Sequence, residues 1–435
     1  MLRTLDQVNL KGKRVLLRVA YDVTLALVGN KWTVPDDQRL RASLPTINYL
    51  LTQGCSLVLL SWLGRPKVGV MDDQFKMDSV AERLSMLLGR KVQKLDQTVG
   101  PEVDKIVSKM KPGEIVMLEN TRFNAGENEA DPALAKQMAA TGEFVVYDAF
   151  AQSHRVHAST TGILEYHPDS CCAGFLMEKE VKVLGQILAG PMEPFVLILG
   201  GAKVSDKIAM IRNVLDRAAI VLIGGALANP FFKAHGLAVG GSIVESSFVD
   251  QAKGNSVDPV EVAKELIAKT NGLIVPHELT PGQWPDGEPV ALTKVQLPVD
   301  IIVGKKRKQG GYDNSSLRIE KINGQKELCA MDEAILDIGP YTAYLYGEIV
   351  KRARTIFWNG PMGYFEEFSF SQGTKTVAEA VAASKGFSVI GGGDTEGVVT
   401  RFNLENQFGH VSSGGGASLA LLAGEEFPVL KYLEA

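Results

Sequence analysis

Short apolar runs rich in β-branched residues alternate along this chain with longer amphipathic stretches. The apolar runs predict strands at 14–19, 56–61, 114–118, 144–147, 195–199, 219–223, 299–303, 355–358 and 387–390. The stretches between them predict helices at 41–53, 79–88, 131–140, 206–217, 259–269, 340–352 and 374–384. Strands that alternate with helices are typical of parallel sheets covered on both faces, so we expect an α/β protein.

The predicted strands form two series, four in the first part of the chain and five in the second. A chain of 435 residues is longer than one core usually supports, so two domains are expected. A helical stretch ending at Gly190-Pro191 lies between the series and suits a connector. Residues 278–330 do not follow the pattern and are interpreted as irregular, with the basic run 305–308 as a solvated loop.

Charge and composition exclude several classes of protein. The net charge of −4 gives no reason to expect nucleic-acid or anionic-membrane partners. The longest apolar stretch, 218–232, is interrupted by glycines and Pro230 and is short of a membrane span. The four cysteines of the chain lack metal-type or Cys-x-x-Cys spacing, which favours a reducing compartment. We therefore expect a soluble, cytoplasmic protein.

Three glycine clusters carry the strongest functional signal: 199–208, 391–395 and 412–418. Glycine turns at helix starts let backbone N–H groups approach a phosphate, and the helix dipole adds positive charge there. Neither the Walker A spacing nor the dinucleotide-binding Gly-x-Gly-x-x-Gly spacing is present, so phosphoryl transfer at another kind of site is indicated.

Charged residues accompany the clusters. Lys203 and Lys207, four positions apart, would share one face of a helix. Asp394 follows three glycines and is interpreted as a Mg²⁺ ligand near phosphates, with a helix N-cap as the alternative.

Arginines fall beside the ends of the predicted strands in the first part of the chain. These are Arg18, Arg39, Arg65, Arg122 and Arg155. Because ligands bind at the carboxyl ends of parallel strands, the arginines are expected to converge on a small acid that carries phosphate and carboxylate groups. His154 and His157 lack a third ligand at metal spacing and are interpreted as phosphate-facing or structural.

An ordered series of motifs runs through the chain. It comprises Leu63–Pro66, Leu118–Phe123, Asp148–Phe150, His154–Ser159, Gly174–Glu180, Gly200–Ile208, Leu336–Pro340, Trp358–Gly363, Gly391–Thr395 and His410–Ser418. Together they resemble the phosphoglycerate kinase family over essentially the whole chain. The resemblance implies two Rossmann-like, three-layer αβα domains whose parallel sheets face a hinged cleft, in a monomer.

The same resemblance implies that different parts of the chain bind different ligands. Residues 1–176 would form the 3-phosphoglycerate domain, 177–192 a linker helix, 193–410 the nucleotide domain, and 411–435 a tail that returns to the first domain. Phosphoryl groups would move reversibly between 1,3-bisphosphoglycerate and ADP, with Mg²⁺ as cofactor and ATP or ADP as co-substrate.

Residue roles are carried over position by position. Catalytic roles are implied for Arg39, Lys203, Lys207, Gly392 and Gly415. The acid would be bound by Arg18, Asp22, Arg39, Arg65, Arg122, Arg155 and His157. The nucleotide would be bound by Gly201, Ala202, Lys207, Gly225, Ile335, Asn359, Glu366, Gly392, Gly393, Asp394 and Thr395, with Asp394 holding the metal.

The chain departs from the family pattern mainly around the acid. Ala20 replaces an aspartate, Asp22 an asparagine and Trp62 a histidine, and Asp22 is a candidate replacement for the missing carboxylate. Ala226 and Ile335 alter the base site, so the sequence does not decide whether the nucleotide is ATP or GTP. The alternatives are a related kinase for another small acid and a catalytically inactive nucleotide-binding paralogue.

Overall fold

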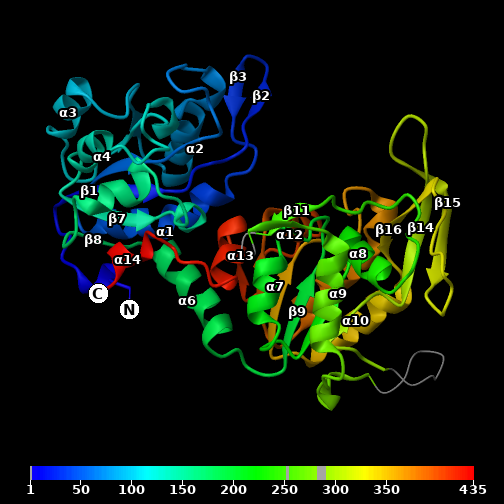
Figure 1. Ribbon diagram of the computed structural model, residues 1–435. Helices are drawn as coiled ribbons and strands as arrows, with labels where there is room; N and C mark the ends of the chain where they lie inside the picture. The colour runs from blue at the N-terminus through cyan, green and yellow to red at the C-terminus, as the bar shows by residue number, and fades with distance from the viewer. Residues whose placement is uncertain (1, 251–253, 282–290) are drawn as a thin grey trace. The chain divides into compact units, whose positions relative to one another are not determined.

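The computed structural model describes residues 2–250, 254–281 and 291–435, and the chain divides into two compact units (Figure 1). One unit is Met1–Lys182 with Glu426–Ala435, and the other is Val183–Glu425. The division falls within α6 (Phe175–Ala189), in the stretch expected to connect two domains. Residues 411–425, expected in the tail, group with the second unit.

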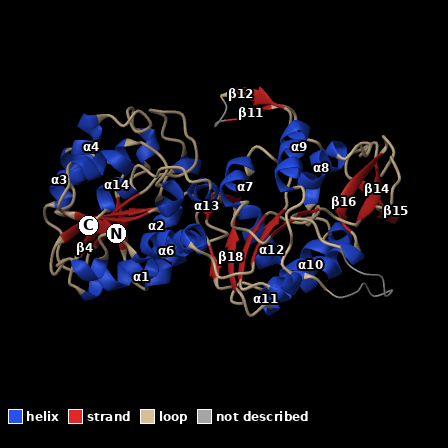
Figure 2. Ribbon diagram, turned by 60° about the horizontal axis from the view of Figure 1, so that its bottom comes forward, coloured by secondary structure: helices blue, strands red, loops and turns tan. Residues whose placement is uncertain are grey.

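The first unit is built on a six-stranded parallel sheet. Its order is β5 (Val92–Lys94), β6 (Ile115–Met117), β4 (Ser56–Leu60), β1 (Arg14–Val19), β7 (Phe144–Asp148) and β8 (Cys171–Ala173). All residues of β4 and β7 are buried, because helices cover both faces of the sheet (Figure 2). The helices are α1 (Gln38–Thr52), α2 (Asp78–Leu88), α3 (Pro101–Val107), α4 (Pro132–Ala139), α5 (Ile163–Glu165) and α14 (Leu430–Leu433). Beside them lies a hairpin of β2 (Ala26–Val28) and β3 (Lys31–Thr33).

The second unit repeats this architecture. Its parallel sheet has the order β13 (Val295–Gln296), β10 (Ile220–Ile223), β9 (Phe195–Leu199), β17 (Thr355–Asn359), β18 (Phe387–Gly391) and β19 (His410–Val411). Ile198, Trp358 and Ile390 from three neighbouring strands are fully buried in one core. The helices are α7 (Ile208–Val214), α8 (Ala228–Ala234), α9 (Pro259–Thr270), α10 (Pro340–Arg352), α11 (Gln372–Ala383), α12 (Gly393–Arg401) and α13 (Gly416–Leu422). The α/β prediction is confirmed for both units.

A three-stranded antiparallel sheet at one edge of the second unit corrects two predictions. It consists of β14 (Asp300–Lys306), β15 (Tyr312–Lys321) and β16 (Glu333–Ile338) (Figure 1). The predicted run 299–303 therefore does not join the parallel sheet, and the segment interpreted as irregular contains a ten-residue strand. Only residues 282–290 of that segment lie outside the described part of the chain. A further antiparallel pair joins β11 (Phe248–Asp250) to β12 (Asn255–Val257).

The described part of the chain contains no helix long and apolar enough to cross a membrane. The four cysteines are buried, free thiols.

Candidate active site

Glycines bring the backbone together at the carboxyl ends of β9, β10 and β17. The N–H of Gly201 donates to the carbonyl of Pro361 at 2.8 Å, and that of Gly225 donates to Met362 at 2.7 Å. A Cβ on Gly200 would lie 2.0 Å from the Pro361 oxygen, so no other residue fits there. Gly201 itself has a φ of +83°, which side chains rarely adopt. This edge of the sheet therefore presents bare backbone to a ligand.

The turn from β18 into α12 has the backbone geometry that suits an anion. Gly392 has a φ of +92°, and the first helical hydrogen bond runs from the N–H of Glu396 to the Gly392 carbonyl at 3.0 Å. The N–H groups of residues 393–395 precede that bond and point out of the helix start. A Cβ on Gly393 would meet open space, and Asp394 is exposed beside it. Phosphate groups are well matched to such a terminus.

Two predicted ligands in this region hold the turn through their side chains. The Thr395 hydroxyl accepts from the N–H of Gly360 at 2.6 Å and donates to the Gly391 carbonyl at 2.9 Å. The Asn359 amide donates to the same carbonyl at 2.6 Å. In the structure, the Thr395 hydroxyl and the Asn359 amide therefore position β18 and α12.

The lysine pair does not share a helix face, because α7 begins only at Ile208. Lys203 and Lys207 lie in the turn before it, where Lys203 is exposed and Lys207 is only 7% exposed. The Lys207 ammonium lies 3.6 Å from the position of a Cβ on Gly201. Burial lowers the pKa of Lys207, and the carboxylates of Asp206 and Asp394 oppose this shift. Within the described residues its ammonium has no hydrogen-bond or ion-pair partner, so the buried charge is available to a ligand phosphate.

Glu245 shapes the same turn, and the sequence analysis missed it. Its carboxylate accepts hydrogen bonds from the N–H of Val204 at 2.7 Å and of Ser205 at 3.0 Å, and from the Ser205 hydroxyl. The contact spans about forty residues of chain, and no motif surrounds Glu245. Sequence patterns carry no signal for it.

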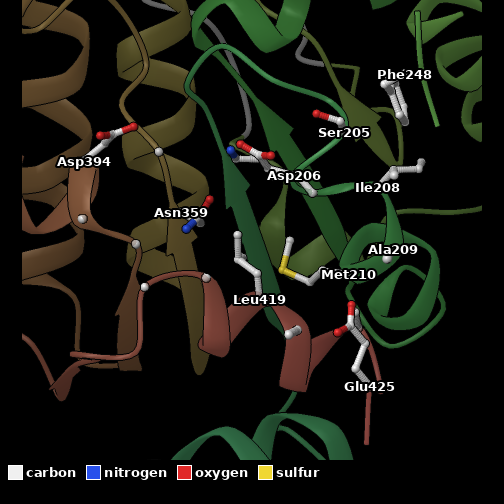
Figure 3. Close-up of a pocket in the computed structure, with 18 of the residues that line it drawn as sticks. Ser205, Asp206, Ile208, Ala209, Met210, Phe248, Asn359, Asp394, Leu419 and Glu425 are labelled. Carbon is white, nitrogen blue, oxygen red and sulfur yellow. The ribbon is translucent and has the colours of Figure 1, made fainter. Parts of the chain in front are cut away.

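Two cavities gather the predicted nucleotide ligands of the second unit. The first, of about 480 Å³, lies between α7, the α12 turn and α13 (Figure 3). Its lining includes Lys207, Asn359, Gly392, Gly393, Asp394, Thr395 and Gly415. The second, of about 510 Å³, is lined by Gly201, Ala202, Gly225, Ile335, Glu366 and Asp394, among others. Asp394 lines both, whereas Lys203 lines neither.

The metal site is predicted at one carboxylate, that of Asp394. The described residues contain no group of three or more His, Cys, Asp or Glu side chains placed to bind a metal. A single carboxylate fits Mg²⁺, which commonly takes one or two carboxylates together with phosphate oxygens and water.

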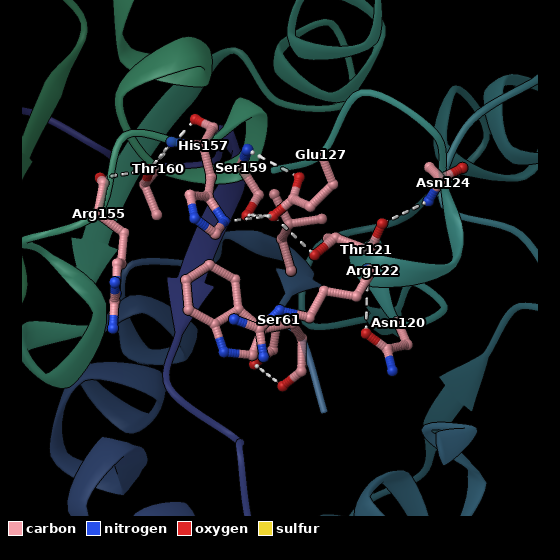
Figure 4. Close-up of polar contacts among 12 residues, drawn as sticks. Ser61, Asn120, Thr121, Arg122, Asn124, Glu127, Arg155, His157, Ser159 and Thr160 are labelled. Carbon is pink, nitrogen blue, oxygen red and sulfur yellow. Dashed lines mark hydrogen bonds and ion pairs between the residues drawn. The ribbon is translucent and has the colours of Figure 1, made fainter. Parts of the chain in front are cut away.

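In the first unit, Trp62 lies against two predicted acid ligands, Arg18 and Arg122. Figure 4 shows Arg122 among the polar residues around it. The centroid of its ring is 4.6 Å from the guanidinium carbon of Arg18 and 4.4 Å from that of Arg122. Arg18 is fully buried, and its guanidinium donates to the carbonyls of Ser159 at 2.8 Å, Leu60 at 3.5 Å and Val19. Burial lowers the pKa of Arg18.

A buried carboxylate, that of Glu127, lies near Arg18 and His157. It accepts from the hydroxyls of Thr121 at 3.0 Å and Ser159 at 2.5 Å, and lies 3.9 Å from Nδ1 of His157. Burial raises the pKa of Glu127. Burial and the charges of Arg122 and Arg18 lower the pKa of His157 to about 4, so its ring is neutral near pH 7.

The remaining predicted acid ligands lie around Arg122. Asp22 accepts from the N–H of Gly64 at 2.7 Å, and its other oxygen is 4.0 Å from Nη1 of Arg122. Burial lowers the pKa of Arg122, and the carboxylates of Asp22 and Glu127 oppose this shift. The charges of Arg65 and Arg155, which are both exposed, add to the lowering. Arg39 lies on the first turn of α1, outside this network of contacts in the described residues.

Helix starts suited to anions beside a buried lysine in one α/β unit, and an arginine cluster at the sheet edge of the other, are typical of a phosphotransferase that moves a phosphoryl group between a nucleotide and a small acid. The phosphoglycerate kinase family model matches residues 5–425. Phosphoglycerate kinase from Moorella thermoacetica is 42% identical over 427 residues, covering 98% of this chain and 97% of its own. The Dictyoglomus turgidum protein of the same name is 41% identical over 429 residues, covering 98% and 96%.

Solved structures agree. Phosphoglycerate kinase from Coxiella burnetii has a TM-score of 0.79 and 34% identity, with 100% of this chain and 99% of that chain covered. The enzyme from Pyrococcus horikoshii has a TM-score of 0.79 and 32% identity, with 100% and 98% covered. The chain belongs to the phosphoglycerate kinase family. Its activity is that of a phosphotransferase with a carboxyl group as acceptor, in the glycolytic reaction between 1,3-bisphosphoglycerate and ADP.

Proposed function

We propose that the second unit binds the nucleotide along its two cavities and that the first unit binds the glycerate acid. The observation that carries this proposal is the buried ammonium of Lys207, which lines one cavity together with the start of α12. A cation and a row of backbone donors at one place neutralise the charge of transferring phosphoryl oxygens.

Within the second unit, the resemblance assigns the ribose to Glu366 and the base site to the surroundings of Ala226 and Ile335, with Gly225 as a further nucleotide contact; all four line the second cavity. The phosphates would lie against Gly201, Ala202 and the N–H groups of residues 393–395. Asp394 would hold Mg²⁺, which neutralises phosphate charge and orients the polyphosphate.

Transfer to or from an acyl phosphate needs positioning rather than a protein nucleophile. Lys207 stabilises the nucleotide phosphates, while the exposed Lys203 follows the moving phosphoryl group and Arg39 meets it from the acid side. The N–H groups of Gly392 and Gly415 complete the donor set. The two ligands must meet with water excluded before transfer, so transfer requires a movement of the two units.

The acid would be bound by Arg65, Arg122 and Arg155, with Arg18, Arg39, Asp22 and His157 as the further positions that the family pattern assigns. Free, buried thiols support a reducing compartment, and the proposal includes a cytoplasmic monomer that uses Mg²⁺.

The test is Mg²⁺- and ATP-dependent acyl phosphate formation from 3-phosphoglycerate, coupled to glyceraldehyde-3-phosphate dehydrogenase. Lys207→Ala is expected to lower kcat by about 10²–10³-fold, as loss of one preorganised donor does. Lys233→Ala, which removes an exposed lysine from α8, is the matched control and should leave kcat unchanged. Equal turnover of Lys207→Ala and wild type overturns the assignment of Lys207, and no turnover in wild type with Mg-ATP bound favours a non-catalytic paralogue.

A further inference from the structure

Trp62 occupies the position between two guanidinium groups at the sheet edge of the first unit. Its ring centroid is 5.1 Å from that of His157, and the tryptophan is only 3% exposed. The family pattern has a histidine here, whose ring nitrogens donate or accept hydrogen bonds. Indole offers one N–H donor and a broad apolar face, so this position can accept no hydrogen bond from a ligand.

Contact with the indole changes what Arg18 can do. The arginine donates to three backbone carbonyls and is fully buried, and Trp62 stacks on its guanidinium. Stacking of this kind is a stabilising cation–π contact. Arg18 therefore supports the indole with its stacked face, and its Nη2, which has no hydrogen-bond partner in the described residues, remains a donor for a bound anion beside Arg122, Arg65 and Arg155.

A second apolar residue, Ala20, follows the strand next to the one that leads to Trp62. β1 and β4 are parallel neighbours with Arg18 opposite Leu60, and the N–H of Tyr21 donates to the Ser61 hydroxyl at 2.9 Å. Ala20 and Trp62 thus follow adjacent strands at one edge. In the family pattern these positions hold a carboxylate and an imidazole, and here they hold a methyl group and an indole.

The nearest candidate replacement for the lost carboxylate is already engaged. One oxygen of Asp22 accepts from Gly64 at 2.7 Å, and the other faces Arg122 at 4.0 Å. Arg122 in turn donates to the Gly64 carbonyl at 2.6 Å. Asp22 therefore holds the loop at Gly64, and a substrate hydroxyl that approached its second oxygen would have to compete with the guanidinium of Arg122.

We infer that Trp62, with Ala20, determines acid specificity: the site binds the phosphate and carboxylate ends through its arginines and does not select for the 2-hydroxyl group. The inference rests on the proposed function. A site that hydrogen-bonds a substrate hydroxyl rejects the analogue lacking it strongly, because its own polar group is left unpaired, whereas an apolar surface discriminates weakly. The enzyme is therefore a phosphotransferase for 3-phosphorylated short-chain acids with or without the hydroxyl.

The test compares kcat/KM for 3-phosphoglycerate with that for 3-phosphopropionate, which lacks the 2-hydroxyl group. Wild type is expected to prefer 3-phosphoglycerate by less than about 10-fold. The double variant Ala20→Asp with Trp62→His restores both polar groups and should raise this preference at least about 10-fold above that of wild type. A wild-type preference above 10-fold, or an active double variant with unchanged preference, overturns the inference.

Binding supplies a readout that does not depend on turnover or on the stability of the double variant. Either acid should change the tryptophan fluorescence of wild type and of Trp32→Phe, a control on β3, with similar dissociation constants. Trp62→Phe should lose this signal, and calorimetry should show that it still binds both acids. If 3-phosphopropionate does not bind wild type, the inference is wrong; if neither acid supports turnover although Mg-ATP binds, the proposed function itself fails.

Discussion

Glu245 accepts hydrogen bonds from both polar groups of Ser205, its backbone N–H at 3.0 Å and its hydroxyl. The same carboxylate binds the N–H of Val204, which is itself 1% exposed. Three donors on one acceptor fix the turn that carries Lys207 toward Gly201. Glu245 is thus a positioning residue for a cation that it does not touch.

Removal of this acceptor should affect both stability and turnover. Glu245→Ala leaves the donors of the turn unpaired and is expected to lower the free energy of unfolding by about 1–3 kcal/mol. Misplacement of Lys207 should also lower kcat by about 10-fold while the KM for the acid is unchanged. Urea unfolding and steady-state kinetics measure the two effects. Glu261→Ala, on the exposed face of α9, is the control, and an unchanged kcat in Glu245→Ala would remove the positioning role.

Asp394 is expected to set the magnesium requirement. Asp394→Asn keeps the shape of the side chain but removes its charge, so the Mg²⁺ concentration for half-maximal activity should rise about 10-fold at saturating nucleotide. Magnesium titrations of wild type, Asp394→Asn and the exposed control Glu405→Gln measure this. The same titration curve for all three would place the metal on other groups.

Strands with continuous apolar sequence were predictable. All five residues of β9 are buried, because a parallel sheet covered on both faces excludes water from every position. The strand β15 was missed because its residues are mostly polar and its place in the sheet depends on main-chain pairing with β14. Such pairing leaves no hydrophobic pattern in the sequence.

Site residues follow a similar division. The glycine turn at 391–393 was recognisable, since backbone approach to a phosphate requires glycine, and the structure places residues 392 and 393 on one cavity. The contact of Glu245 with the 204–205 turn and the stacking of Trp62 on Arg18 depend on tertiary proximity of distant segments. The sequence indicated Arg18 as a ligand candidate because it is an arginine near the end of a strand. Only the structure shows that its side chain is fully buried.

Two residues of the basic run at 305–308 line a cavity of the second unit. Lys306 and Arg307 line the cavity of about 510 Å³, whereas Lys308 does not. Lys306→Ala and Arg307→Ala should each raise the dissociation constant for ATP by about 3–5-fold at low salt, because cations near the cavity attract the polyphosphate. Lys308→Ala is the matched control from the same hairpin. If calorimetry gives all three variants the dissociation constant of wild type, at low and at high salt, the whole run is a solvated loop without a role in nucleotide binding.

The free energy of unfolding should decrease as the pH falls, because His154 and His157, which lie near the arginines of the first unit, resist protonation in the folded state. Burial and the charge of Arg155 lower the pKa of His154 to about 4. Burial and the charges of the arginines around it lower the pKa of His157 to about 4 as well. The carboxylate of Glu127 lies 3.9 Å from Nδ1 of His157. The unfolded chain binds the proton at about pH 6.5 and the folded chain near pH 4, so each contribution is complete above pH 6.5 and is lost as the pH falls.

Urea unfolding at pH 7 and pH 5 measures this loss. His157→Gln should reduce the acid-dependent decrease in the free energy of unfolding by about 1 kcal/mol relative to wild type, after allowance for partial solvent screening. Carboxyl groups with raised pKa values act in the opposite direction, and the contribution of Asp148, which has no contact with His157 within the described residues, cancels in the comparison. His235→Gln, which removes the histidine that follows α8, is the control and should match wild type. Parallel pH dependences for wild type and His157→Gln would mean that His157 is not held neutral by the arginines around it.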